Sequence, residues 1–360
     1  MEPTFLIAGR PVGGGAPCWV VAELSANHRR DLQRAVSLVR AAAEAGADAV
    51  KTQTYRPETM TLPLREGPFL HHAPDSPWRG RSLWELYEEG ALPWEWQAEM
   101  KRVAEDLGLA FLSSAYDRNA VDFLDRLDVP AIKIASFELV DLPLIEYAAS
   151  TGRPLILSTG MATLAEIGEA VDAVRSGGGR RVVLLKCTSR YPTRAEEVNL
   201  RGMVRLAEEF GVPVGFSDHT TGIDAAAAAA AAGAALIEKH FTLREGGATL
   251  DDAFSLGPEE FRELVGAVRR VEVLLGSPEL EPVPGEGESL GFRRSLYAVR
   301  DIARGEPFTP ENVRALRPAG GLAPKYWNRI RGRTAARDLR RGEPLTWEAV
   351  AEDGETSCGE

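Results

Sequence analysis

The chain has 360 residues, of which 44% are hydrophobic and 26% charged, which excludes a disordered, collagen-like or disulfide-stapled protein and predicts a sizeable core. Its 42 lysines and arginines against 53 aspartates and glutamates give a net charge of −11, which argues against nucleic acid as the main partner. Any anionic ligand must therefore be bound by a local basic pocket.

In chain order, eight short apolar or β-branched runs alternate with eight helical stretches. The expected strands are residues 18–23, 47–53, 109–114, 131–136, 154–159, 182–187, 213–218 and 235–240. The expected helices are roughly residues 31–45, 94–107, 117–127, 142–151, 163–176, 197–210, 222–233 and 258–275. Strands that alternate with helices favour a parallel sheet, and eight such units predict an α/β protein with a closed (β/α)8 TIM barrel over residues 1–275. A doubly wound open sheet is the alternative, although no G-x-G-x-x-G follows the first strand.

An insertion at residues 54–92 separates the second strand from the next helix. It contains two tryptophans, several prolines and the pair His71 and His72. Long loops that follow the strands of a barrel lie over its active face, so this insertion is a candidate lid.

The chain changes character after the last helix. Residues 276–291 are rich in Pro, Gly and Glu without helical or strand period, which is typical of an interdomain linker. Residues 292–360 contain LYAVRDIARGEPFT and TAARDLRRGEPLT, two copies of an apolar strand followed by the same turn. We expect a short β-rich module, too small to bury much core alone, that docks on another surface.

The three cysteines, Cys18, Cys187 and Cys358, are widely spaced with no C-x-x-C pair, which favours a reducing compartment over a disulfide framework or a zinc ribbon. No basic segment leads into a long apolar run at the N-terminus, and the Ala-rich run 225–235 is too short and too weakly hydrophobic to span a bilayer. We therefore expect a cytoplasmic protein with no membrane partner.

Polar side chains gather where the expected strands end, which is the active face of a barrel. They include three of the six lysines and three of the five histidines, namely Lys51, Lys133, Lys186, His28, His219 and His240, while Lys239 beside them is expected on the helix side. Two lysines and five serines describe a site for a phosphate or a carboxylate: Lys51, Ser114, Lys133, Ser136, Ser158, Ser189 and Ser217. A single serine after a strand is also a common helix cap, so the lysines carry this prediction.

Two histidines close adjacent expected strands, at a spacing that can place both imidazoles on one divalent cation. These are His219 and His240, with Asp218 and Glu23 expected nearby. Two nitrogens and one or two carboxylates leave coordination positions open, which suits Lewis-acid activation of a carbonyl. Cys187 is expected to face away from Lys186 and to be buried and inert.

At these residues the sequence resembles the sialic acid synthase family over nearly its whole length. The matching motifs are AELSANH (22–28), GADAVKTQTY (46–55), SSAYD (113–117), IKIASFE (132–138), ILSTGMAT (156–163), KCTSRYP (186–192), GFSDHT (215–220), EKHFT (238–242) and DDAFSL (251–256). The C-terminal module resembles the antifreeze-like (SAF) domain of that family.

The resemblance implies an enzyme that condenses phosphoenolpyruvate with the open-chain aldehyde of an amino sugar, giving a nine-carbon 2-keto acid and phosphate. By motif, the lysines and serines of the anion site would bind phosphoenolpyruvate, and His219 and His240 would bind Mn²⁺ or Mg²⁺. Glu23 would orient water at the metal or exchange protons, and Glu138 would lie near the attacking carbon. Gln53, Tyr191 and Asp251 would line the sugar site. Arg317 would reach the sugar's acyl group from the partner subunit of a domain-swapped homodimer.

Within the family, SANH, KCTS and LRPAGGLAPKY resemble the pseudaminic acid branch, whose sugar is 2,4-diacetamido-2,4,6-trideoxy-L-altrose. EGGATLDD and SSAYD depart from the expected pattern, so a neuraminate or legionaminate synthase that uses N-acetylmannosamine or a related sugar is the alternative. A Schiff-base aldolase with Lys133 as nucleophile is a more distant alternative. A non-catalytic barrel with an ice-binding or docking module is opposed by the many arginines of residues 292–351.

Overall fold

The structure is a computed structural model that describes residues 4–73, 76, 78–244 and 249–352. The chain divides into two compact units, residues 1–276 and 277–360, and each is described by itself. Cys358 lies outside the described residues, as do part of the candidate lid and residues 245–248 of the EGGATLDD segment.

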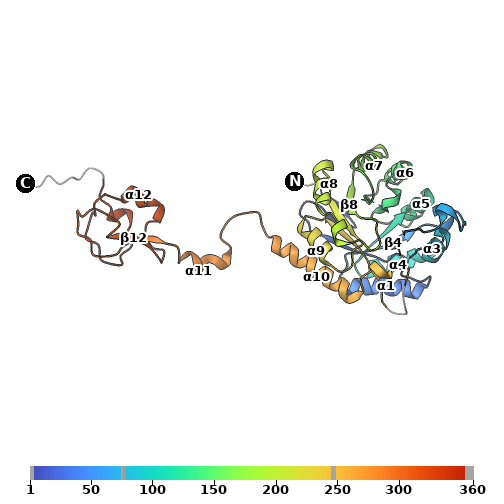
Figure 1. Ribbon diagram of the computed structural model, residues 1–360, viewed down its shortest axis with the longest axis horizontal. Coiled ribbons are helices and arrows are strands. Elements are labelled where there is room, and N and C mark those ends of the chain that lie inside the picture. Colours follow the sequence, from blue (N-terminus) through green and yellow to red (C-terminus); the bar gives the residue numbers. More distant parts are fainter. Residues whose placement is uncertain (1–3, 74–75, 77, 245–248, 353–360) are drawn as a thin grey trace, which may run out of the picture. The chain divides into compact units, whose positions relative to one another are not determined.

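The first unit is a closed barrel of eight parallel strands surrounded by helices (Figure 1), so the predicted fold is confirmed. In barrel order the strands are β10 (Leu236–His240), β3 (Trp19–Glu23), β4 (Ala49–Thr54), β5 (Ala110–Ala115), β6 (Ile132–Ile134), β7 (Leu155–Ser158), β8 (Val182–Cys187) and β9 (Val214–Asp218). The covering helices are α1 (Leu32–Glu44), α4 (Gln97–Asp106), α5 (Arg118–Arg126), α6 (Leu142–Ser150), α7 (Leu164–Ser176), α8 (Arg201–Phe210), α9 (Asp224–Ala231) and α10 (Pro258–Leu275). Each of the eight predicted strands and helices overlaps one of these.

Several helices begin at a residue whose side chain accepts hydrogen bonds from the first turn. Asp31 accepts from two backbone N–H groups of α1, Asp117 caps α5, and Thr163 forms a capping box with Glu166 in α7. Each of these helices follows a strand of the barrel, so its cap marks where a loop of the active face ends.

Alternation along the strands decides which side chains enter the barrel. The inward layer includes Val21, Ala49, Leu112 and Ile156, while residues one position away pack outward against the helices. In each of these four strands the next inward-facing residue, two positions further along, is polar: Glu23, Lys51, Ser114 and Ser158. The period of two therefore delivers these polar groups to one end of the barrel.

An N-terminal hairpin that the sequence pattern did not reveal packs against the inner layer. Its strands, β1 (Phe5–Ile7) and β2 (Arg10–Val12), are antiparallel, and Ile7 and Val12 are buried with Trp19 at the start of β3. Three residues per strand are too few for a recognisable alternation.

The insertion after β4 has secondary structure of its own. It forms α2 (Pro57–Met60), a 3-10 turn (Gly67–Phe69) and α3 (Leu83–Gly90), which begins at a capping box of Ser82 and Glu85. The proposed lid movement of this insertion stays a prediction.

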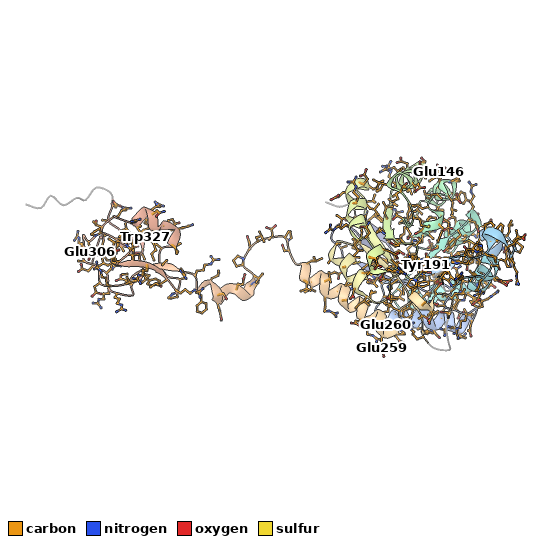
Figure 2. The ribbon with its side chains drawn as sticks, viewed as in Figure 1. Glu146, Tyr191, Glu259, Glu260, Glu306 and Trp327 are labelled. Carbon is orange, nitrogen blue, oxygen red and sulfur yellow. The ribbon has the colours of Figure 1, made fainter. Side chains whose placement is uncertain are left out.

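The second unit contains an antiparallel pair, β11 (Ser295–Ala298) and β12 (Val313–Leu316), and two short helices, α11 (Gly287–Leu290) and α12 (Trp327–Ile330). Figure 2 labels Glu306 and Trp327 in this unit and Tyr191 in the barrel. Both copies of the repeated turn have a glycine at positive φ, 82° at Gly305 and 86° at Gly342.

Two expectations for this region were wrong. The second unit buries an apolar cluster of its own around Phe308, Ile330 and Leu345, because its turns fold back on one another through isolated bridges. Helix α11 lies within the segment expected to have no helical period. Among the described residues, no helix is long and apolar enough to cross a membrane.

Candidate functional site

A cavity of about 850 Å³ opens at the carboxyl ends of the barrel strands. All eight strands contribute to its lining, and residues of the insertion after β4 and of the segment before α10 complete it. A concave site of this size suits a small substrate.

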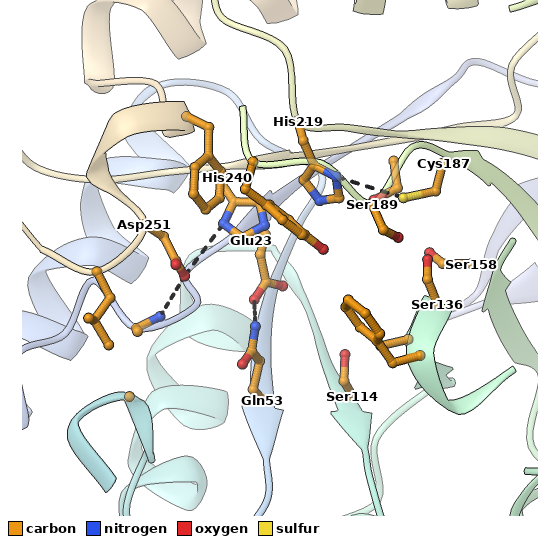
Figure 3. Close-up of a pocket in the computed structure, with 18 of the residues that line it drawn as sticks. Glu23, Gln53, Ser114, Ser136, Ser158, Cys187, Ser189, His219, His240 and Asp251 are labelled. Carbon is orange, nitrogen blue, oxygen red and sulfur yellow. Dashed lines mark hydrogen bonds and ion pairs between the residues drawn. The ribbon is translucent and has the colours of Figure 1, made fainter. Parts of the chain in front are cut away.

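The two lysines and five serines of the predicted anion site all line this cavity. Lys51 Nζ donates to Ser114 Oγ at 3.0 Å, and Lys133 Nζ donates to Ser158 Oγ at 2.7 Å and to the carbonyl of Ile134 at 3.0 Å. The structure therefore brings these residues together. Figure 3 labels four of the serines in the cavity, Ser114, Ser136, Ser158 and Ser189. The hydroxyl of Ser189 is buried with no hydrogen-bond partner among the described residues, which leaves a donor for a ligand.

The two lysines differ in their charge environment. Lys51 Nζ lies 2.5 Å from Glu23 Oε2 and 3.6 Å from Glu238 Oε1. Burial opposes the charged form of Lys51, but these two carboxylates outweigh it and raise its pKa. Lys133 has no ion pair in the part of the chain that the structure describes, and burial lowers its pKa. Lys133 is thus the cation with charge left for an anionic ligand.

Two further carboxylates differ in how they are held. Glu23 Oε1 accepts from the side-chain amide of Gln53 at 3.1 Å. Burial raises the pKa of Glu23 and raises that of Glu138 to about 7, so Glu138 can exchange a proton near neutral pH. One oxygen of Glu138 is buried without a hydrogen-bond partner among the described residues.

The two predicted histidines face each other across the end of β9 and β10. Figure 3 shows the two rings beside each other. The ring centroids of His219 and His240 lie 5.3 Å apart, and the Nδ1 of His219 lies 3.0 Å from the carbonyl of Thr188. The Nδ1 of His240 is buried without a hydrogen bond among the described residues, and it lies 3.9 Å from a carboxylate oxygen of Asp251. Two adjacent imidazoles with an orphaned ring nitrogen and a neighbouring carboxylate fit a divalent metal with open positions.

Asp218 does not belong to this donor set, so that part of the prediction was wrong. Its carboxylate lies 2.8 Å from Lys239 Nζ, behind the strands and away from the cavity. Among the described residues, no group of three or more histidine, cysteine, aspartate or glutamate side chains is arranged to hold a metal. The described residues thus offer two imidazoles to a metal, which would leave coordination positions for substrate or water.

The residues predicted to line the sugar site separate into two groups. Gln53, Tyr191 and Asp251 line the cavity, and the Tyr191 ring centroid lies 4.4 Å from that of His219. Asp251 accepts a hydrogen bond from Ser25. Arg317 lies in the second unit, one residue after β12, where it is exposed. Its role stays a prediction.

Two residues predicted at the rim, Lys186 and His28, do not line this cavity. Lys186 Nζ points outward, where it donates to the carbonyl of Cys187 at 2.8 Å, and His28 Nε2 lies 3.2 Å from the carbonyl of Gly90. Lys239 points to the helix side, as expected. Cys187 faces the cavity, with Sγ 3.7 Å from the Nδ1 of His219. Cys187 is buried, as expected. Burial opposes its thiolate, yet His219 and other neighbours lower the pKa of Cys187 to about 7. That this thiol is inert stays a prediction.

Sequence reasoning missed Glu238 and the apolar wall of the cavity. Glu238 precedes His240 by two residues and so shares its inward direction, which is the signal that would have found it. The wall includes Met60, Trp78 and Leu86 from the insertion, and Phe254. No spacing in the sequence places loop residues of this kind.

Comparison with known proteins gives consistent matches. The sequence profile of the NeuB family matches residues 38–279, and that of the SAF domain matches residues 293–351. The chain is 43% identical to pseudaminic acid synthase of Helicobacter pylori over 322 residues, 89% of this chain and 94% of that protein. It is 38% identical to N,N'-diacetyllegionaminic acid synthase of Legionella pneumophila over 348 residues, 95% of this chain and 97% of that protein.

Among solved structures, N-acetylneuraminic acid (sialic acid) synthetase from Leptospira borgpetersenii in complex with citrate matches with a TM-score of 0.72. The match has 29% identity and covers 81% of this chain and 96% of that chain. The resemblance inferred from the motifs is confirmed.

Proposed function

The chain belongs to the NeuB family and carries an SAF domain, and we propose that it is a pseudaminic acid synthase. The reaction is the condensation of phosphoenolpyruvate with 2,4-diacetamido-2,4,6-trideoxy-L-altrose to a nine-carbon 2-keto acid and phosphate. Relatives named as pseudaminic acid synthases at 43% and 41% identity support this choice of sugar.

The proposal is supported mainly by one observation: the basic, hydroxyl-rich anion site, called the basic half of the cavity below, and a pair of imidazoles line the same cavity. Lys133 and the serines line the same cavity as His219 and His240. A reaction that joins an anionic enol to an aldehyde needs both halves at once, because negative charge develops at the aldehyde oxygen and at the leaving phosphate.

The basic half would bind phosphoenolpyruvate. Lys133 would supply the charge that its phosphate or carboxylate needs, and Lys51, which is already paired with Glu23, would donate hydrogen bonds together with Ser114, Ser136, Ser158, Ser189 and Ser217. Carbon three of the enol would then attack the aldehyde, water would add to the cation at carbon two, and the tetrahedral intermediate would expel phosphate.

His219 and His240 would hold Mn²⁺ or Mg²⁺, which supplies Lewis-acid polarisation of the sugar aldehyde when bound. Glu23 would orient the attacking water, because its carboxylate is held in place by Lys51 and Gln53. Glu138, with its pKa near 7, would give or take a proton near the attacking carbon.

The sugar would lie between Gln53, Tyr191 and Asp251 and the apolar wall of Met60, Trp78, Leu86 and Phe254. Such a wall favours a sugar with a methyl group in place of a hydroxymethyl group and with acetamido methyls, since apolar surface gains from leaving water. This supports the trideoxy sugar over N-acetylmannosamine.

We also propose a domain-swapped homodimer in the cytoplasm, in which Arg317 of the partner subunit reaches the sugar. Exposed apolar side chains after β6 and β7 support a covered barrel mouth: Phe137 is 59% exposed, Val140 60% and Met161 61%.

The test is phosphate release from phosphoenolpyruvate by chelated and by metal-restored protein, with each sugar in parallel. Metal-dependent release with the altrose derivative supports the proposal. Release with N-acetylmannosamine alone would favour the neuraminate alternative, and the Legionella relative makes N,N'-diacetyllegionaminate synthesis the next candidate to assay.

A further inference from the structure

Behind the two histidines lies a pair of residues that the reaction itself does not use. Asp218 and Lys239 immediately precede His219 and His240, and the register of β9 and β10 places Lys239 directly opposite Asp218. Because side chains alternate across a strand, this pair points toward the helices while both imidazoles line the cavity.

Asp218 and Lys239 form a small network of buried hydrogen bonds with the backbone of Thr220. Both side chains are 0% exposed, and Lys239 Nζ lies 2.8 Å from Asp218 Oδ2. Lys239 Nζ also donates to the carbonyl of Thr220 at 2.5 Å, and Asp218 Oδ1 accepts from the backbone N–H of Thr220 at 2.8 Å. The residues on both sides of His219 are therefore fastened to the residue that precedes His240.

Stability alone does not account for this arrangement. The neighbouring outward residues of the same strands, Phe216 and Ile237, are apolar and belong to the main core. Replacing a buried ion pair by apolar residues is often neutral or stabilising, so a pair at this place is weak evidence for a contribution to folding. Its position one residue before each imidazole indicates a geometric role.

We propose that the Asp218–Lys239 pair is a positioning device that holds His219 and His240 at the separation needed to bind one divalent cation. The inference rests on the proposed function, in which the two histidines bind the metal. Neither Asp218 nor Lys239 touches the reacting atoms; each acts through the histidine that follows it.

The test is calorimetric titration of the metal-free, full-length protein with Mn²⁺, which does not depend on turnover. Asp218→Leu/Lys239→Met replaces the charges by apolar side chains. Its Kd for Mn²⁺ should rise about 10-fold, the lower end of the effect of groups that orient metal ligands, because the pair acts on the histidines through the backbone. Asp218→Asn/Lys239→Gln keeps hydrogen-bonding groups, but the Gln side chain is shorter than that of Lys. A smaller rise in the Kd for Mn²⁺ is expected for this variant. The visible spectrum of bound Co²⁺, which reports coordination geometry, should change in both.

Arg153→Met is the matched control. Arg153 Nε lies 2.7 Å from Asp125 and its NH1 lies 2.9 Å from Asp128, in an ion-pair cluster between other parts of the same barrel. This variant should lower Tm and leave the Kd for Mn²⁺ unchanged. The Kd for phosphoenolpyruvate should stay unchanged in all variants, since its lysines lie on β4 and β6.

Unchanged Mn²⁺ affinity and an unchanged Co²⁺ spectrum in a folded double variant would overturn the positioning role. An equal loss of affinity in Arg153→Met would overturn it as well, because general destabilisation would then explain the effect. If the Asp218→Leu/Lys239→Met variant does not fold, the Mn²⁺ affinity and the Co²⁺ spectrum of Asp218→Asn/Lys239→Gln decide the question. Wild-type protein that binds no Mn²⁺, or His219→Ala protein that binds it equally well, would instead overturn the metal site of the proposed function and the positioning role with it.

Discussion

Lys51 is enclosed by carboxylates, whereas Lys133, two strands further round the barrel, is not. The Nζ of Lys51 lies 2.5 Å from Glu23, while Lys133 Nζ contacts only neutral oxygens among the described residues, those of Ser158 and Ile134. Two lysines of one cavity therefore have different tasks: the first orders a carboxylate, and the second offers an uncompensated charge.

Lys133→Met should raise KM for phosphoenolpyruvate by about 10- to 100-fold, because a charge-assisted hydrogen bond contributes roughly 1.5–3 kcal/mol. Steady-state kinetics measure this. Lys101→Met is the control, since Lys101 pairs with Glu105 on α4, away from the cavity. An unchanged KM would contradict the assignment. Borohydride treatment with substrate should trap no adduct; a trapped adduct on Lys133 would support a Schiff-base aldolase.

His219→Ala should abolish phosphate release while leaving the fold intact, because the barrel does not depend on one imidazole at its open end. Circular dichroism and thermal unfolding check the fold, and a phosphate assay checks activity. An unfolded variant would remove the support for a catalytic role, and retained activity would exclude one.

Arg317→Ala should raise KM for the sugar about 10-fold or more and leave KM for phosphoenolpyruvate unchanged, since the lost contact is a charged hydrogen bond to the sugar alone. Arg314→Ala, at an exposed position of β12 three residues earlier, is the matched control. Equal sugar KM values for the two variants would count against the role of Arg317.

Glu138 makes stability depend on pH. Burial raises its pKa from 4.5 to about 7 in the folded protein, so between these values the folded state holds a proton that the unfolded state has lost. Its contribution is complete below pH 4.5 and is lost as pH rises through 7, at about 1.4 kcal/mol per pKa unit before solvent screening.

Glu138→Gln should therefore gain stability relative to wild type as pH rises from 5 to 8, measured by chemical denaturation. Glu146→Gln, at an exposed position of α6, is the matched control that removes a carboxyl group from the same part of the chain. A pH-independent difference for Glu138→Gln would show that burial does not hold this proton.

The sequence predicted the barrel and most of its inward residues because helices and strands alternate regularly and the polar residues cluster at the strand ends. The sequence did not predict which residues of β8 face the cavity. VVLLKC is apolar on both faces, and the inward side of such a buried strand is set by its register with its neighbours. Lys186 was placed at the rim and Cys187 away from it, and the reverse holds.

The contacts of the insertion with the cavity could not be predicted from the sequence either. Trp78 reaches the cavity because its indole N–H donates to the carbonyl of Leu250 at 2.9 Å, 172 positions away in the chain. A contact between two loops has no periodic signature, so the apolar wall became visible only in three dimensions.

The proposed reaction is a condensation that expels phosphate from carbon two of phosphoenolpyruvate. The most direct measurement uses phosphoenolpyruvate labelled with heavy oxygen at the bridging position and the diacetamido trideoxy altrose, with mass spectrometry of both products. One labelled phosphate is expected for each new nine-carbon 2-keto acid. Unlabelled phosphate, or pyruvate in place of the nine-carbon acid, would contradict it.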